Sequence, residues 1–164
     1  MKLDIQKAFD TVSRSYLLEV LQALRSGLHL CELVSILFRT AASRALLNGV
    51  PGGKSQHARG VRQGDLLLLM LFILAMDPLQ RLLDLATSYN VLTQLPLVVA
   101  KWRLSTYDDD AAIFVNPKKE DIDAIKIILE TFRKVSGLCI NMDKSSIHMI
   151  RCKDNKSLVT HLKL

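Results

Sequence analysis

The sequence predicts an α+β fold in which helices cover one face of an antiparallel sheet. Strand-like apolar runs lie near the N-terminus, on both sides of residue 107 and near residue 140, and stretches with helical spacing of apolar residues lie between them. At 164 residues, 49 % of them hydrophobic, the chain has the length and apolar content of one domain with its own core. Aromatic residues make up only 5 %, so aliphatic side chains must form most of that core.

The helices are predicted from apolar periodicity and from the residues that flank each stretch. Ser13 or Ser15 is suited to cap the first helix and Gly27 to end it, and Asn116 with Pro117 fits the cap and first turn of the last helix. An unbroken run of eleven apolar residues opens the third helix. A bilayer span needs roughly 20 such residues, so we expect a buried helix and no membrane. The expected helices are one with the apolar stripe Leu17, Leu18, Leu21 and Leu24, and three over 30–42, 66–86 with a kink at Pro78, and 117–135.

The strands are predicted from short apolar runs bounded by turn residues. Three adjacent acids, Asp108 to Asp110, separate two such runs and indicate a hairpin. The turn Asn48-Gly49 ends another strand and continues as a loop over 51–54. This order places Asp4, in the first strand, where it could lie next to the acidic hairpin. The expected strands are 3–8, 45–50, 97–104, 111–115 and a final short pair, 138–140 and 147–150.

Charge and cysteine usage limit the classes of function. The net charge is +6 and the pI is near 9.4, which is compatible with a nucleic-acid partner. Cys31, Cys139 and Cys152 show no CxxC spacing, which is typical of reduced thiols in an intracellular protein, nuclear or cytoplasmic, and excludes a disulfide framework or a zinc site. No secretory signal opens the chain, and no base–nucleophile pattern supports a hydrolase triad.

The acidic segment is the first candidate site. Three adjacent carboxylates repel one another and are best tolerated where a cation offsets their charge, although a solvated turn is the commoner role of such a triplet. With Asp4 beside them they suit Mg²⁺, which prefers one or two carboxylates. Two such ions roughly 3.5–4 Å apart can activate a 3′-hydroxyl and stabilise a leaving pyrophosphate. In this interpretation Asp4 and Asp109 bridge the metals and Asp110 supports them.

Three further features are compatible with a nucleotide, each beside an ordinary structural role. Arg62, Gln63 and Gly64 precede a helix, where main-chain N–H groups and a basic side chain favour phosphate. Taken alone, the segment fits a simple helix start capped by Asp65 better. Phe9 could lie near the sugar of a nucleotide or be a core aromatic. Lys144 could place its ammonium group near a pyrophosphate or be a solvated surface lysine.

Four ordered motifs of the chain resemble those of reverse transcriptases. Their sequences are close to those of LINE-type non-long-terminal-repeat retrotransposons of plants. The resemblance covers roughly residues 2–153 and implies a polymerase palm-like fold, with fingers and thumb largely missing and a polar tail at 154–164. The motifs are Lys2-Leu3-Asp4-Ile5-Gln6-Lys7-Ala8-Phe9-Asp10, Gly60-Val61-Arg62-Gln63-Gly64-Asp65, Tyr107-Asp108-Asp109-Asp110, and Ser136-Gly137-Leu138-Cys139-Ile140-Asn141 with Lys144-Ser145.

The resemblance implies an RNA-directed DNA polymerase that uses Mg²⁺, or Mn²⁺ in its place, with an RNA template, a DNA primer and dNTPs as partners. It leaves the oligomeric state open. Phe9 would discriminate against a ribose 2′-hydroxyl, and Arg62, Gln63, Gly64 and Tyr107 would bind template and nucleotide. The catalytic residues carried over by position are Asp4, Asp109, Asp110 and Lys144, and the metal-binding residues are Asp4, Ile5, Asp109 and Asp110.

The chain departs from the family pattern in two motifs. Asp108 stands where the family usually has alanine, and Leu66 to Leu69 replace a segment that usually contains two prolines and a serine. Together with the expected loss of fingers and thumb, these changes predict a truncated copy that is inactive alone. The alternative is a non-catalytic basic domain that binds nucleic acid weakly. We also expect that Asp108→Ala would tighten metal-dependent primer binding, because the added carboxylate repels phosphate.

Overall fold

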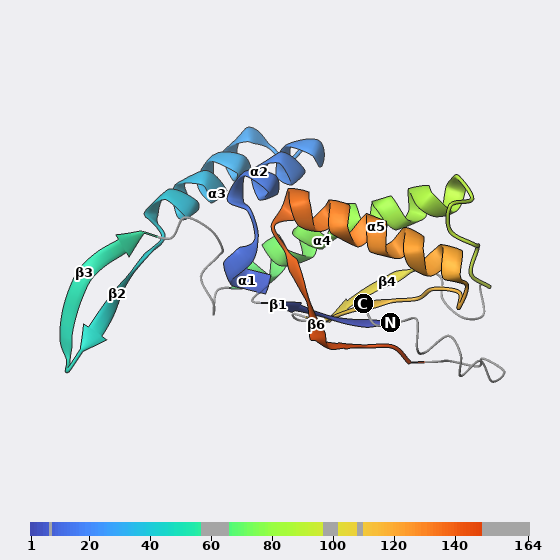
Figure 1. Cartoon of the computed structure of the whole chain (residues 1–164). Helices are drawn as coiled ribbons and strands as arrows, with labels where there is room; N and C mark the ends of the chain where they lie inside the picture. The colour runs from blue at the N-terminus through green and yellow to red at the C-terminus, as the bar shows by residue number, and fades with distance from the viewer. Residues whose placement is uncertain (7, 57–65, 97–101, 108–109, 149–164) are drawn as a thin grey trace.

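A four-stranded antiparallel sheet forms the base of the molecule, and helices cover one of its faces (Figure 1). The computed structural model describes residues 1–6, 8–56, 66–96, 102–107 and 110–148. The strand order is β4-β5-β1-β6, so the N-terminal strand lies inside the sheet, next to β5, the second strand of the acidic hairpin. The strands are β1 (Lys2–Gln6), β4 (Leu104–Tyr107), β5 (Asp110–Ile113) and β6 (Cys139–Ser146). This arrangement confirms the α+β class and the neighbouring positions predicted for Asp4 and the hairpin.

The helices begin and end close to the positions that the sequence predicts. Ser13 caps α2 by accepting a hydrogen bond from the main-chain N–H of Tyr16, and Gly137 ends α5 in a left-handed conformation with φ of 77°. Pro78 lies inside α4, which continues through it. Among the helices of the described ranges, none combines the length and apolarity that a bilayer crossing requires. The helices are α1 (Ala8–Thr11), α2 (Arg14–Ala23), α3 (Leu28–Thr40), α4 (Leu66–Ser88) and α5 (Lys119–Ser136).

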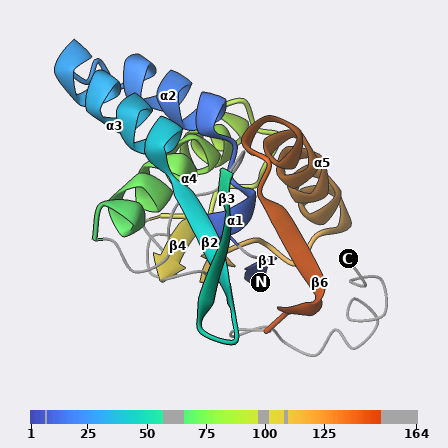
Figure 2. The ribbon, with the colours of Figure 1, turned by 90° about the vertical axis from the view of Figure 1, so that its left-hand side faces the viewer.

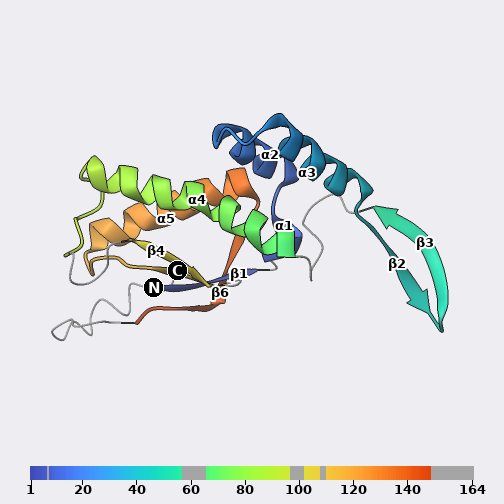
Figure 3. The ribbon, with the colours of Figure 1, turned by 180° about the vertical axis from the view of Figure 1, so that it is seen from behind.

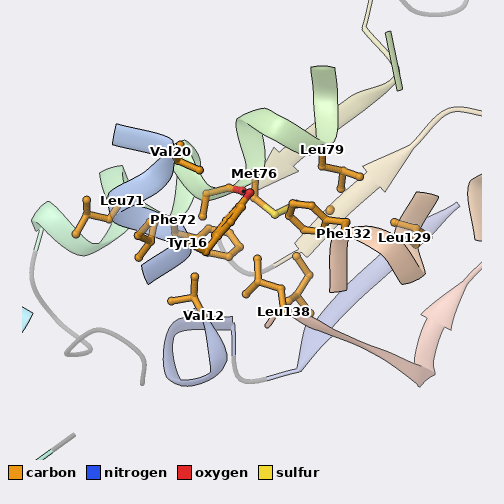
Figure 4. Packing of buried hydrophobic residues seen from close by; sticks show 14 of the residues in the cluster. Val12, Tyr16, Val20, Leu71, Phe72, Met76, Leu79, Leu129, Phe132 and Leu138 are labelled. Atoms are coloured by element: carbon orange, nitrogen blue, oxygen red, sulfur yellow. Dashed lines mark hydrogen bonds between the residues drawn. The ribbon is translucent and has the colours of Figure 1, made fainter. Parts of the chain in front are cut away.

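The core fills the space between α2, α4, α5 and the covered face of the sheet (Figure 4). Its centre is the edge-to-face pair of Tyr16 and Phe132, whose ring centroids are 6.2 Å apart. The Tyr16 hydroxyl donates a hydrogen bond to the main-chain oxygen of Ala75 in α4 at 2.8 Å. Burial, together with the nearby charge of Asp77, raises the pKa of Tyr16 well above its ordinary value. The Tyr16 hydroxyl therefore stays protonated. The side chain links α2 to α4 through its hydrogen bond and to α5 through its contact with Phe132.

A buried polar cluster closes the end of the core where α4 leads into β4. Asp121, 2 % exposed, accepts hydrogen bonds from the main-chain N–H and the hydroxyl of Thr93. Arg103, 4 % exposed, donates to the Thr87 hydroxyl at 2.7 Å and to the main-chain oxygen of Thr93. Because these buried polar groups have hydrogen-bond partners, the cluster anchors the connection without leaving desolvated groups unpaired.

A separate two-stranded hairpin projects beyond the helices (Figures 2 and 3). Its strands are β2 (Ala42–Leu47) and β3 (Val50–Gln56), joined by Asn48 and Gly49 with φ of 50° and 81°. Positive φ at both central residues is the geometry that two-residue hairpin turns require, and Asn-Gly is the favoured pair for it. Every residue of β3 is exposed, so the hairpin contributes little to the core.

Several sequence-based expectations need correction. The segment 51–54 is part of β3 and not a loop, because hairpin pairing with β2 overrides its weak strand propensity. Instead of a final pair of short strands, one irregular strand, β6, runs over Cys139–Ser146; residues 147 and 148 follow it outside any strand, and residues 149 and 150 lie outside the described residues. Asn116 does not cap α5; its amide donates to the main-chain oxygen of Thr93, and Lys118 takes the cap position without a side-chain hydrogen bond.

Residues 70–76, the part of the apolar segment of α4 whose burial the structure describes, are only partly buried, whereas the sequence predicted a buried helix. Leu71 and Phe72 are 2 % exposed, but Met70 and Ile73 are 62 % and 52 % exposed, because a helix lying on one face of a sheet buries a single stripe. Most of the predicted strand 97–104 and the tail 154–164 lie outside the described residues. Cys31 and Cys139 are free thiols.

Candidate functional site

Two carboxylates lie opposite one another on the two central strands of the sheet. The register of the β1–β5 pair sets Asp4 against Asp110 and Leu3 against Ala111. Leu3 and Ala111 are each 1 % exposed beneath the helices, and side chains alternate along a strand, so both acids lie on the open face. Directly opposed side chains have Cβ atoms about 4.5–5.5 Å apart. Two carboxylates at that separation can bind one cation together.

The Asp110 carboxylate already has a cationic partner within the chain. The Lys2 ammonium nitrogen lies 2.7 Å from Asp110 Oδ2. Lys2 precedes Asp4 by two residues, so it shares the open face and lies diagonally across from Asp110. Half of the Lys2 side chain and a third of the Asp110 side chain are exposed (51 % and 34 %). The ion pair is therefore in contact with solvent.

The other neighbour of β1, strand β6, carries a bulge beside Asp4. Lys2 pairs with Ser146 and Asp4 with Asn141, so the β6 residues 142–145 stand opposite Leu3 alone. The Ser145 hydroxyl spans this irregularity: it accepts from the Asp4 main-chain N–H at 3.3 Å and donates to the Asn141 main-chain oxygen at 2.7 Å. Lys144 lies within the bulge and is exposed. The predicted Lys144 is thus on the strand next to Asp4, although no hydrogen bond or ion pair joins it to the two acids.

Two predicted nucleotide-binding aromatics lie at the same end of the sheet. Tyr107 is the last residue of β4, stands directly opposite Asp110, and is 85 % exposed. Phe9 belongs to α1, the short helix that follows β1. The C-terminal end of α5 holds the segment after α1 in place, because the Ser13 N–H donates to the Ser136 oxygen at 2.8 Å. A Cβ at Gly137 would lie 2.8 Å from the main-chain oxygen of Thr11, so the two segments are in close contact.

The remaining predicted residues divide between the covered face and the undescribed segments. Ile5 is 5 % exposed on the helix-covered face, so only its main chain could contribute to a site on the open face. The residues outside the described ranges are Arg62, Gln63, Gly64, Asp108 and Asp109. The structure therefore brings together Asp4, Asp110, Tyr107 and Lys144 on adjacent strands.

Comparison with known proteins shows the family of this chain. The family model described as "Reverse transcriptase (RNA-dependent DNA polymerase)" matches residues 1–161. The chain belongs to the reverse transcriptase family. A 149 kDa protein of transposon TX1 from Xenopus laevis, described as uncharacterized, is 32 % identical over 146 residues, which is 89 % of this chain and 11 % of that protein.

Two further relatives are Pol polyproteins of R2 retrotransposable elements. The one from Nasonia vitripennis is 33 % identical over 87 residues, covering 53 % of this chain and 8 % of the relative. The one from Drosophila melanogaster is 27 % identical over 145 residues, covering 87 % and 13 %. This reverse transcriptase domain thus has non-LTR retrotransposon homologues and spans about a tenth of their length.

The donor set of this reverse transcriptase domain fits a hard divalent cation. The two opposed carboxylates supply oxygen ligands, and the open face leaves the remaining coordination positions to water and phosphate. The 2.7 Å contact with Lys2 shows that the site accommodates positive charge. Within the described ranges, no three His, Cys, Asp or Glu side chains form a metal-binding group. Asp4 and Asp110 would hold the ion, and Asp109 lies outside the described residues.

Two residues at this site were not predicted from the sequence. Lys2 was given no role, yet its position two residues before Asp4 in a strand already implied the same face of the sheet. Ser145 follows the predicted Lys144, but its contact with Asp4 depends on the bulge of β6, which no sequence pattern indicated.

Proposed function

We propose that this chain is the palm part of an RNA-directed DNA polymerase that adds dNTPs to a DNA primer on an RNA template. We further infer, from the sequences of its motifs, that it comes from a LINE-type element of a plant. The observation that carries the proposal is the pairing of Asp4 with Asp110 on the open face of a palm-like sheet. The family match supplies the reaction class, and the opposed acids supply ligands that this reaction needs.

In this proposal the chain's own residues bind the metal and orient the primer and the dNTP. Asp4 and Asp110, with Asp109, would hold Mg²⁺ or Mn²⁺, which would supply Lewis-acid activation of the primer 3′-hydroxyl and charge stabilisation for the leaving pyrophosphate. The main chain of Ile5 lies next to Asp4 and is available as a further ligand. The exposed Lys144 is available to the phosphates of the dNTP from the neighbouring strand. Because Asp4 and Asp110 sit on hydrogen-bonded central strands, their main chains are positioned before the substrate arrives.

The nucleotide would lie over the open face between Tyr107 and the segment after β1. Phe9 in that segment would discriminate against a ribose 2′-hydroxyl, and Arg62, Gln63 and Gly64 would bind the template and the incoming nucleotide. We propose that the 164-residue chain alone has at most residual activity. In the described part of the chain, helices cover the opposite face only, so positioning over the acids is incomplete (Figure 1). Asp108 stands where the family usually has alanine, and we expect its added carboxylate to repel the primer phosphate.

A primer-extension assay tests the proposal. Purified chain is given a primed RNA template, dNTPs and Mg²⁺ or Mn²⁺, and incorporation is measured over long incubations. We expect slow, template-dependent incorporation that falls at least about tenfold in Asp4→Asn, Asp109→Asn and Asp110→Asn, since ligands that act in the transition state contribute on that scale. Asp123→Asn, an exposed acid on α5, is the matched control and should keep the wild-type rate.

The assay also distinguishes the polymerase from a second candidate function, nucleic-acid binding without catalysis. The net charge of +6 favours nucleic-acid binding, which a non-catalytic domain would also provide. Salt-sensitive, sequence-independent binding with no incorporation in either metal would support this alternative. Incorporation that survives Asp4→Asn and Asp109→Asn would exclude these residues as the catalytic acids.

A further inference from the structure

We propose that Lys2 is an internal counter-cation of the carboxylate pair and competes with the divalent metal for Asp110. This inference rests on the proposed function, because it concerns the metal site of that function. Its basis is the ion pair of 2.7 Å between the Lys2 ammonium and Asp110 Oδ2. The contact occupies an oxygen that would otherwise be available to a metal shared with Asp4.

The sheet fixes the geometry of this contact. Lys2 and Asp4 lie on the same face of β1, and the residue directly opposite Lys2 is Ala112. On the other side of β1, the residue directly opposite Lys2 is Ser146 of β6. The diagonal neighbour, Asp110, offers the carboxylate that the ammonium contacts. The hydrogen-bonded strands therefore keep Lys2 close to Asp110 whether or not metal is present.

An ammonium group and a divalent cation exclude one another at the same carboxylate oxygen. Mg²⁺ binds oxygen at about 2.0–2.1 Å, so an ammonium 2.7 Å from that oxygen would meet strong charge repulsion. The lysine stem is flexible and half-exposed, and it can move away when metal binds. The displaced ammonium stays on the open face, where it can contact a phosphate oxygen. Asp110 thus keeps a cationic partner in both states.

Competition predicts that loss of the lysine tightens metal binding. Mn²⁺ affinity is measured by following the electron paramagnetic resonance signal of the free ion at about 0.1 M salt. Lys2→Met should lower the Kd about two- to fivefold, the scale of a partly exposed ion pair. Lys2→Arg keeps the charge and should bind like the wild type. Lys54→Met on the projecting hairpin removes the same charge at a distance and should leave the Kd unchanged.

Two companion measurements separate failure of this inference from failure of the proposed function. If Asp4→Asn and Asp110→Asn bind Mn²⁺ as tightly as the wild type, the metal site itself is wrong. If both weaken binding but Lys2→Met binds equally or more weakly than the wild type, only the competition is wrong. The fold of each variant is checked by circular dichroism, and Lys2→Gln replaces Lys2→Met if the latter does not fold.

A thermodynamic cycle in EDTA adds a readout that is independent of metal. Unfolding is measured for Lys2→Met, Asp110→Asn and the double variant. Because the two side chains are in contact, their effects on unfolding free energy should be non-additive. Strict additivity would show that the ion pair does not persist in solution and would overturn the inference.

Discussion

At the scale of single residues, the site depends on main-chain contacts as much as on its charged groups. Asp4 is held by strand pairing on both sides, with Asp110 on one and Asn141 on the other. Ser145 completes the second side, because its hydroxyl bonds to the Asp4 N–H and to the Asn141 oxygen across the bulge. The serine therefore determines where β6 places Lys144 relative to the acids.

Removal of the Ser145 hydroxyl should loosen this part of the sheet. Ser145→Ala deletes two hydrogen bonds, and each contributes about 0.5–1.5 kcal/mol, so we expect a loss of about 1–3 kcal/mol in unfolding free energy. Amide hydrogen exchange at Asp4 should accelerate. Ser105→Ala, an exposed serine on edge strand β4, is the control and should change stability by less than about 0.5 kcal/mol. Unchanged exchange at Asp4 in Ser145→Ala would contradict this role.

At the scale of elements, the C-terminal end of α5 supports the segment that follows β1. Gly137 adopts a φ of 77°, and a Cβ there would lie 2.8 Å from the Thr11 main-chain oxygen. The Ser13 N–H donates to the Ser136 oxygen in the same region. A helix end and the segment carrying Phe9 are thus in direct main-chain contact. This contact links the stability of α5 to the geometry of the nucleotide side of the proposed site.

A side chain at Gly137 should disturb both the helix end and this contact. Gly137→Ala combines a left-handed residue, which costs about 1–2 kcal/mol, with a main-chain clash. We therefore expect a loss of at least about 2 kcal/mol in denaturant unfolding. Gly53→Ala, where a Cβ meets nothing within 4 Å, should be close to neutral. Equal stabilities of the two variants would show that the contact is unimportant.

At the scale of the whole molecule, the sequence predicted the α+β layers and the neighbouring positions of Asp4 and the hairpin. Both predictions follow from apolar periodicity, which indicated four helices, and from turn residues that bound the strands. The register of the strands could not be predicted from the sequence. The alternation of side chains along a strand determines which face a residue occupies, but not which residue lies opposite it. Thus the pairing of Asp4 with Asp110 came only from the structure.

Other failures have local physical reasons. Strand β3 contains proline and glycines, which are poor strand formers, but on an exposed two-stranded hairpin they are tolerated. The Ser145 bulge and the role of Asn116 depend on contacts between segments far apart in sequence. The candidate catalytic residues were predicted because four short motifs keep the family's order. Lys2 was not predicted, because a lysine in a basic chain carries no signal of its own.

The most direct test of the central claim is to locate a bound Mn²⁺ by paramagnetic NMR in the 18.4 kDa chain. Substoichiometric Mn²⁺ broadens the signals of nearby amides. The account predicts selective broadening at residues 3–5 and 110–112, which is lost in Asp4→Asn, with α3 and the β2–β3 hairpin unaffected. Broadening centred elsewhere, or the same pattern in Asp4→Asn, would contradict a metal site at the paired acids of this reverse transcriptase domain.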